Sequence, residues 1–127
     1  MFSIHSVSSS RELIFHSRNG DEFEVELKGG TPIAHLQVSA YTNQFGLDDL
    51  MQDLADMKKP WPGSKSWESL EGEFSISAIC TTLGQVIFKV VFRNMLGTAE
   101  EWRLEFGLEV ELGMLKDIGS KSRMFFR

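Results

Sequence analysis

Strict alternation of apolar and polar residues is the feature that most restricts the fold of this chain. In residues 22–28, three apolar side chains alternate with three glutamates, and residues 101–110 alternate over their whole length. Successive side chains of a β-strand point to opposite faces of the sheet. Such runs therefore predict strands of an antiparallel sheet, with one face in the core and the other in water.

The alternation predicts a series of such strands. They cover residues 2–7, 11–17, 22–28, 33–42, 73–82, 85–93 and 101–110, of which the first is short. Between the second and third strands, Asn19-Gly20 supplies residues that tolerate positive φ, as a tight hairpin turn requires. We therefore expect a mostly antiparallel sheet of six to seven strands.

Two stretches change from a period of two to a period of about 3.6 residues, which is typical of an amphipathic helix. The first apolar stripe comprises Leu47, Leu50, Met51, Leu54 and Met57, and the second, within residues 111–125, comprises Leu112, Leu115, Ile118 and Phe125. Pro60 ends the first helix, because proline disfavours a helical conformation in the residue before it. Gly113 and Gly119 each cost about 1 kcal/mol relative to alanine in a helix, so the second helix depends on packing.

Together, the strands and helices predict a two-layer α+β domain. Every predicted strand has one apolar face, so two helices on one face of the sheet would complete the core. The order strand, strand, strand, helix occurs on both sides of the connection 60–66, which suggests a β-β-β-α pseudo-repeat. We expect a single domain over residues 1–127, with halves of about 1–59 and 67–127 joined by a connection that contains Pro, Gly and Trp.

Composition and charge exclude several classes of protein. The chain is 42% hydrophobic and 24% charged, which is typical of a folded globular domain. The net charge of −5 and the scattered basic residues disfavour nucleic acid as a partner, and no apolar run is long enough to span a membrane. The single cysteine, Cys80, excludes an internal disulfide and fits a reducing compartment. Because no signal peptide follows Met1, we expect a cytoplasmic protein.

No residue pattern predicts a catalytic group, a cofactor site or a metal site. The histidines His5, His16 and His35 lack the helical spacing of paired metal ligands, although the last two fall on outward strand faces and could be neighbours. Cys80 falls on an inward face, where a small buried thiol is the better interpretation than a nucleophile. We therefore predict no catalytic, cofactor-binding or metal-binding residues.

Tryptophans and glutamates are the candidates for binding a partner. Trp61 and Trp67 flank the connection between the two halves, where a tryptophan either fixes the connection to the domain or anchors a partner. Glutamates on the outward strand faces could steer a basic partner. The predicted partner-binding residues are Trp61, Trp67, Glu68, Glu71, Glu22, Glu24 and Glu26.

The run Trp67-Glu68-Ser69-Leu70-Glu71-Gly72-Glu73 is also found in a known family. Through this run, the chain resembles a family of small bacterial proteins catalogued as domain of unknown function 6228. The similarity extends to Gly46-Leu47-Asp48-Asp49-Leu50, to Leu83-Gly84 and to Glu111-Leu112-Gly113-Met114-Leu115. The resemblance implies a bacterial origin and a shared fold, but it brings no known activity and no catalytic residues.

We therefore expect a non-enzymatic protein that acts by binding another protein. Acidic bacterial proteins of this build include immunity proteins that neutralise toxins, which serves as an analogy only. One alternative is a small-ligand binder with an apolar cavity between sheet and helices, lined by Phe74, Phe88, Phe92, Trp102 and Phe106. Another is an enzyme that uses Glu68, Glu71 or Glu73 as acid or base. A homodimer is a further alternative, through pairing of an edge strand such as residues 12–17 or through stacking of the water-facing side of the sheet.

Overall fold

The computed structural model describes residues 1–41 and 43–127 and contains two four-stranded antiparallel sheets. The first has the order β1-β2-β3-β4, from β1 (Phe2–His5), β2 (Glu12–Asn19), β3 (Glu22–Lys28) and β4 (Ala34–Ser39). The second has the order β5-β6-β7-β8, from β5 (Lys65–Glu68), β6 (Phe74–Cys80), β7 (Gln85–Asn94) and β8 (Trp102–Glu111). The helix α1 (Gly46–Ala55) follows the first sheet, and a 3-10 turn (Leu112–Met114) leads from the second into α2 (Leu115–Phe126). The chain therefore uses the order β-β-β-β-α twice.

The prediction of one sheet with six to seven strands is wrong, while the α+β class and the antiparallel pairing are confirmed. Alternation shows which face of a strand is buried, but it does not show which strands share a sheet. The missed strand, β5, has only four residues and follows Pro60 and Pro62 in the connection. The predicted strand 33–42 ends earlier, at Ser39, and its last residue, Thr42, lies outside the described residues.

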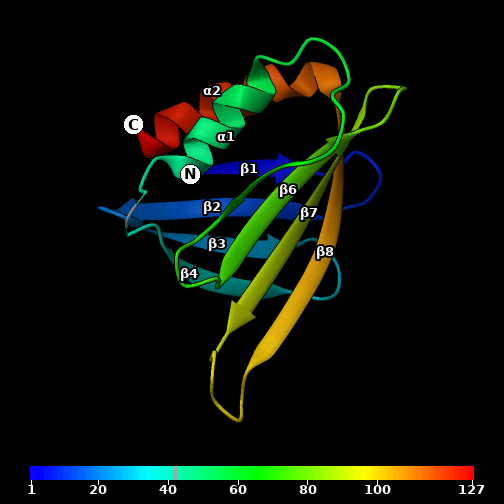
Figure 1. Cartoon of the computed structure of the whole chain (residues 1–127). Helices are drawn as coiled ribbons and strands as arrows, with labels where there is room; N and C mark the ends of the chain where they lie inside the picture. The colour runs from blue at the N-terminus through cyan, green and yellow to red at the C-terminus, as the bar shows by residue number, and fades with distance from the viewer. Residues whose placement is uncertain (42) are drawn as a thin grey trace.

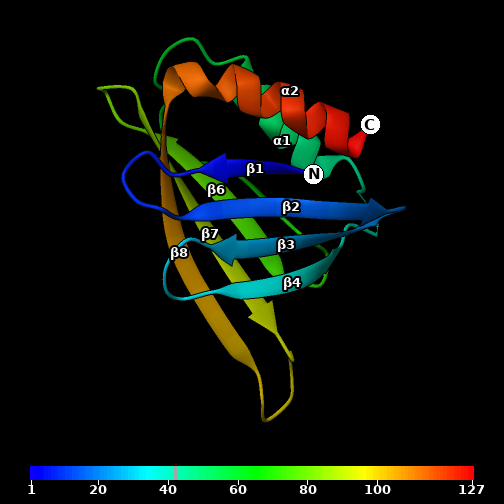
Figure 2. The same ribbon diagram turned by 180° about the vertical axis from the view of Figure 1, so that it is seen from behind.

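The helices close the space between two sheets, rather than covering one face of a single sheet. Figures 1 and 2 show the two sheets facing each other with crossed strands, and the helices side by side along one side of them. At one corner the sheets meet, where Val7 N donates a hydrogen bond of 2.8 Å to Glu109 O. The helix α2 contacts β1, and α1 contacts β5, so the helix pair bridges an edge strand of each sheet.

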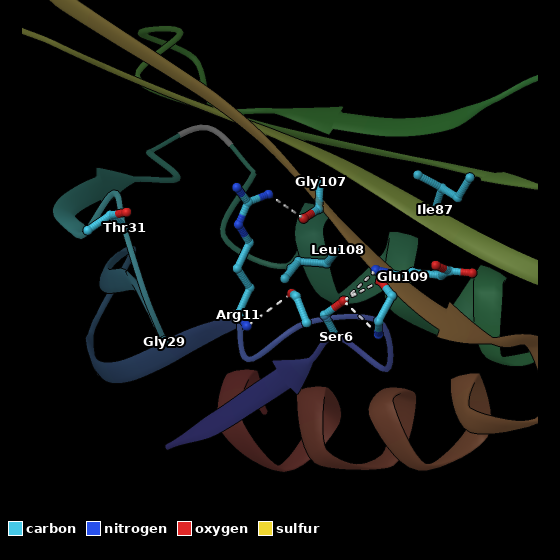
Figure 3. Close-up of a pocket in the computed structure, with 10 residues that line it drawn as sticks. Ser6, Arg11, Gly29, Thr31, Ile87, Gly107, Leu108 and Glu109 are labelled. Carbon is cyan, nitrogen blue, oxygen red and sulfur yellow. Dashed lines mark hydrogen bonds between the residues drawn. The ribbon is translucent and has the colours of Figure 1, made fainter.

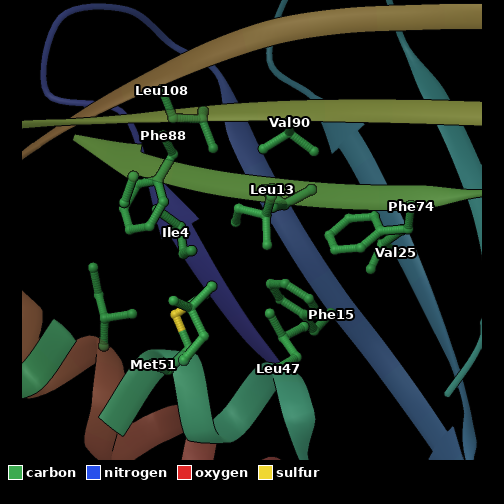
Figure 4. Close-up of a cluster of buried hydrophobic side chains, with 14 of the residues drawn as sticks. Ile4, Leu13, Phe15, Val25, Leu47, Met51, Phe74, Phe88, Val90 and Leu108 are labelled. Atoms are coloured by element: carbon green, nitrogen blue, oxygen red, sulfur yellow. The ribbon is translucent and has the colours of Figure 1, made fainter. Parts of the chain in front are cut away.

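The core consists of the apolar faces that the alternation predicts. Figure 4 shows Phe15 of the first sheet and Phe74 of the second converging with Leu47 and Met51 of α1. The ring centroids of Phe15 and Phe74 are 6.4 Å apart in an edge-to-face contact that joins the sheets directly. All four side chains are almost completely buried, and burial of each stabilises the fold by about 1.5–3 kcal/mol.

Gly119 allows the two helices to approach closely. A Cβ at this position would lie 2.6 Å from the Cβ of Ala55, so any larger residue would push the helices apart. The Gly119 carbonyl also accepts a hydrogen bond of 2.7 Å from Nε2 of Gln52 in α1. The glycine that weakens α2 in isolation therefore permits the packing on which α2 depends.

Candidate functional site

The outer face of the first sheet carries a row of glutamates along the interior strand β3. Glu22 and Glu24 are exposed, and Glu26 is partly exposed. Nε2 of Gln37 on β4 donates a hydrogen bond of 2.8 Å to Oε2 of Glu22, and Nε2 of His16 on β2 lies 2.6 Å from Oε1 of Glu26. We call this surface the acidic face, and it consists of His16, Glu22, Glu24, Glu26, His35 and Gln37.

A bulge in β2 hollows the acidic face. The register between β2 and β3 shifts between Phe15 and Arg18, so that His16 and Ser17 together lie opposite Glu24. Two shallow pockets, with volumes of about 160 Å³ and about 270 Å³, flank this position, and Glu24 lines both. The Glu24 side chain therefore stands between two hollows that can receive the end of a basic side chain.

The strand β4 gives the acidic face an open edge. In the part of the chain that the structure describes, β4 pairs with β3 alone. Ala40 N donates to Asp21 O over 2.7 Å, and the backbone groups of an antiparallel pair alternate in direction from residue to residue. By this alternation, the N–H and C=O groups of His35, Gln37 and Ser39 point away from β3. An extended segment bound at this edge would therefore run beside the glutamates.

The two candidate tryptophans pack against the domain. Trp61 is only 7% exposed, and its Nε1 donates a hydrogen bond of 3.3 Å to Ala78 O in β6. Trp67 lies in β5 and is half-buried, with its ring centroid 6.5 Å from that of Phe23 and 6.2 Å from that of Phe74. These contacts support the interpretation that the tryptophans fix the connection to the domain.

The candidate residues Glu68 and Glu71 lie on the second sheet and its β5–β6 turn, and not with the glutamates of β3. Both are exposed. Gly72, with a φ of 77°, forms the turn, and a Cβ there would lie 3.7 Å from both Oε1 of Glu68 and a guanidinium nitrogen of Arg93. The structure thus brings Glu22, Glu24 and Glu26 together and separates them from the other four candidates.

Metal ligation and nucleophilic chemistry find little support in the described part of the chain. No group of three or more His, Cys, Asp or Glu residues among the described residues could hold a metal ion. Cys80 is half-buried, and burial raises the pKa of its thiol, which favours the less reactive protonated form. Within residues 1–41 and 43–127, no helix is long and apolar enough to cross a membrane.

A buried polar cluster around Asp48 joins the two helices, and no local sequence pattern predicts it. Asp48 is completely buried, and its Oδ1 accepts hydrogen bonds from Ser122 Oγ (2.7 Å) and Gln52 Nε2 (2.9 Å). Its Oδ2 accepts a hydrogen bond of 2.6 Å from Nε of Arg127. Burial raises the pKa of Asp48, but these hydrogen bonds and the charge of Arg127 outweigh burial and hold the pKa below its usual value. The cluster ties the end of α2 to α1.

A polar pocket of about 480 Å³ lies where the β1–β2 loop meets β8 (Figure 3). The backbone N of Glu109 donates a hydrogen bond of 3.2 Å to Oγ of Ser6. A guanidinium nitrogen of Arg11 donates one of 3.2 Å to Gly107 O. Through these hydrogen bonds, polar groups of the loop hold the two sheets together. We therefore interpret the pocket as part of the contact between the sheets.

Two facing antiparallel sheets and a helix pair define an α+β protein with one hollowed acidic sheet face. The model of a family described as "Family of unknown function (DUF6228)" matches residues 5–127, and the chain belongs to this family. The match confirms the resemblance found in the sequence and covers strands β2 to β8 and both helices, but only the last residue of β1. No curated protein and no solved structure matched the chain.

Proposed function

We propose that the protein binds a basic partner protein through the acidic face and the adjoining edge of β4. The observation that carries this proposal is the row of Glu22, Glu24 and Glu26 beside an open strand edge. The proposal names no catalytic residue, in keeping with the lack of a catalytic constellation in the sequence.

Strand addition at β4 would supply the backbone contacts of the complex. An extended segment can pair with the outward N–H and C=O groups of His35, Gln37 and Ser39, as peptides do in many domains with an open sheet edge. Main-chain hydrogen bonds of this kind give affinity for many sequences. Selection among partners would then depend on side chains.

Charge would supply that selection. A strand added at β4 lies roughly 9–10 Å from β3, because neighbouring strands are about 4.8 Å apart. A lysine or arginine on the added strand, pointing to the acidic face, can span this distance together with the side chain of Glu24. The two hollows beside Glu24 leave room for the ends of such side chains. We therefore expect a partner segment with basic residues at alternate positions.

Affinity purification from the source organism tests the proposal. The test variant combines Glu22→Lys, Glu24→Lys and Glu26→Lys. The control combines Asp56→Lys, Glu100→Lys and Asp117→Lys, which are exposed, lie elsewhere and change the net charge equally. The wild type and the control should recover the same partner, and the test variant should lose it. Recovery of that partner by all three proteins would refute the proposal.

Salt and a milder variant separate the charge effect from misfolding. Attraction between exposed charges weakens as ionic strength rises, so binding of the partner should fall with added salt. Glu24→Gln alone removes one charge without introducing repulsion, and it should weaken binding while leaving the unfolding temperature unchanged. If Glu24→Gln binds as the wild type does and salt has no effect, the glutamates do not select the partner.

The alternative of an apolar ligand between the layers draws no support from the packing. The aromatic residues expected to line a cavity are in contact with one another: the ring centroids of Phe74 and Phe92 are 5.9 Å apart, and those of Phe92 and Phe106 are 5.3 Å apart. Phe88 is also completely buried. These rings fill the space in which the ligand would have to bind.

A further inference from the structure

Of the described edge strands, β8 is the longest. It pairs with β7 over ten consecutive residue pairs without a register shift, and it contains no proline and no lysine. The edge strand β1 contacts α2, β5 has only four residues, and β4 has six and follows Pro32 closely. Proteins usually protect an edge with prolines, charged side chains, bulges, short strands or a covering loop. Of these, β8 has exposed charges, which include both signs, and a loop over one end.

Only one part of the β8 edge is open. At one end, the β1–β2 loop covers it, because Val7 N donates a hydrogen bond to Glu109 O. A guanidinium nitrogen of Arg11 donates another to Gly107 O (Figure 3). The rest of β8, toward the β7–β8 turn, extends beyond the first sheet (Figures 1 and 2). The open part therefore comprises residues 102–106.

The backbone direction shows which groups are available there. Leu112 N donates to Gly84 O over 2.9 Å, and this bond sets the alternation along the β7–β8 pair. By this alternation, the backbone N–H and C=O groups of Trp102, Leu104 and Phe106 point to β7. The N–H and C=O groups of Arg103 and Glu105 point to the open edge.

We propose that two copies of this chain pair antiparallel through residues 102–106 of β8, with Arg103 of each copy opposite Glu105 of the other. A two-fold axis through Leu104 creates this register. The four outward backbone groups of each copy then find partners, and two opposite-charge pairs form across the interface. The two second sheets would join into one continuous sheet.

Charge selects this register over its neighbours. A shift of one strand by two residues in one direction places Arg103 opposite Arg103 of the second copy. A shift in the other direction places Glu105 opposite Glu105. Like charges directly opposite each other are destabilising. Arg103 and Glu105 are exposed and already interact within one copy, with 2.9 Å between a guanidinium nitrogen and Oε1. The pair can exchange this contact for one between copies at little cost.

Apolar side chains on the other face of the strand gain burial in the same register. Trp102 and Leu104 are only half-buried, although both face the core side of the sheet. In this register, Leu104 lies beside Leu104 of the second copy, and Trp102 lies beside Phe106 of the second copy. Each of these side chains would thereby gain an apolar neighbour on the same face of the joined sheet. This surface lies on the second sheet, so the dimer does not depend on the acidic face of the first.

Charge swapping tests the register. Molar mass is measured by size exclusion with light scattering over a range of concentrations, for wild type, Arg103→Glu, Glu105→Arg and the double variant. The wild type should dimerise. Each single variant creates two like-charge pairs and should weaken the dimer by at least about tenfold. The double variant restores opposite charges and should dimerise again.

Arg123→Glu is the matched control, because it makes the same charge change at an exposed position on α2 and outside β8. It should dimerise as the wild type does, and all variants should unfold at similar temperatures. A wild type that stays monomeric up to its solubility limit would overturn the proposal. So would a dimer that the single variants leave intact, or one that the double variant fails to restore.

Discussion

Asp48→Asn tests whether the buried carboxylate holds the two helices together. The carboxylate accepts three hydrogen bonds inside the fold, one of them from the charged Arg127. Removal of one partner of a buried ion pair costs about 3–5 kcal/mol when the other partner cannot reach water. Arg127 is 39% exposed and can be rehydrated, so we expect a smaller loss. Asp48→Asn should lower the free energy of unfolding by about 2–3 kcal/mol at pH 7.

The pH dependence of this loss gives a second signature. The pKa of Asp48 is lower in the folded protein than its usual value, which is about 3.9 in an unfolded chain. A depressed pKa stabilises the fold above the unfolded pKa, and the contribution is lost as the pH falls through the folded pKa. The difference between wild type and Asp48→Asn should therefore be complete at pH 7 and shrink in acid below about pH 4.

Urea unfolding at pH 7 and in acid measures both effects, with the fluorescence of the packed tryptophans as the signal. Asp117→Asn is the matched control, because Asp117 is 69% exposed and pairs with Lys121 over 3.0 Å on the surface of α2. It should cost about 0.5 kcal/mol or less. If Asp48→Asn costs no more than this control, the Asp48 carboxylate does not hold the helices together. A cost at pH 7 that persists unchanged in acid would contradict the depressed pKa of Asp48 as its cause.

Three further substitutions test contacts in the fold, each by urea unfolding. Gly119→Ala should destabilise by about 1–3 kcal/mol, because the new Cβ forces α1 away from α2, and a stabilised variant would contradict this packing. Gly29→Ala should be more damaging, since Gly29 has a φ of 97° and a Cβ there would overlap the carbonyl oxygen of Ser10; Gly20→Ala, at a φ of 66° with open space around it, is the control and should cost less. Trp61→Phe should cost about 1–2 kcal/mol through the lost hydrogen bond to β6 and the smaller ring, and an unchanged stability would show that Trp61 does not fix the connection.

Much of the local structure could be predicted, because one strand face is buried and alternation records it directly. The inward Phe23, Val25 and Leu27 of β3 are buried as predicted. The hairpin between β2 and β3 is also confirmed, but its two-residue turn is Gly20-Asp21, because Asn19 is the last residue of β2 and pairs with Glu22. Gly20 supplies the positive φ, at 66°. The division into two sheets could not be predicted in the same way. It depends on which strands pair, and a half-buried strand has the same alternation in either sheet.

Contacts between distant residues account for the other omissions. The helix dipole explains why an acidic residue such as Asp48 occurs in the first turn of α1. Its buried ion pair could not be predicted in this way, because the partner, Arg127, lies 79 residues later in the chain. The residues 12–17 were expected at an edge, but β2 lies between β1 and β3, so this part of the dimer hypothesis is wrong. The edges that are open, β4 and β8, become visible only when the pairing is known.

Amide hydrogen exchange on the captured complex tests the proposed function most directly. Among residues 1–41 and 43–127 of the free protein, no strand pairs with the edge amides of His35, Gln37 and Ser39, so they should exchange quickly. Exchange at these three amides should slow markedly when the partner binds at the β4 edge. Protection confined to other surfaces, with β4 exchanging as it does in the free protein, would contradict binding at the acidic face and its edge.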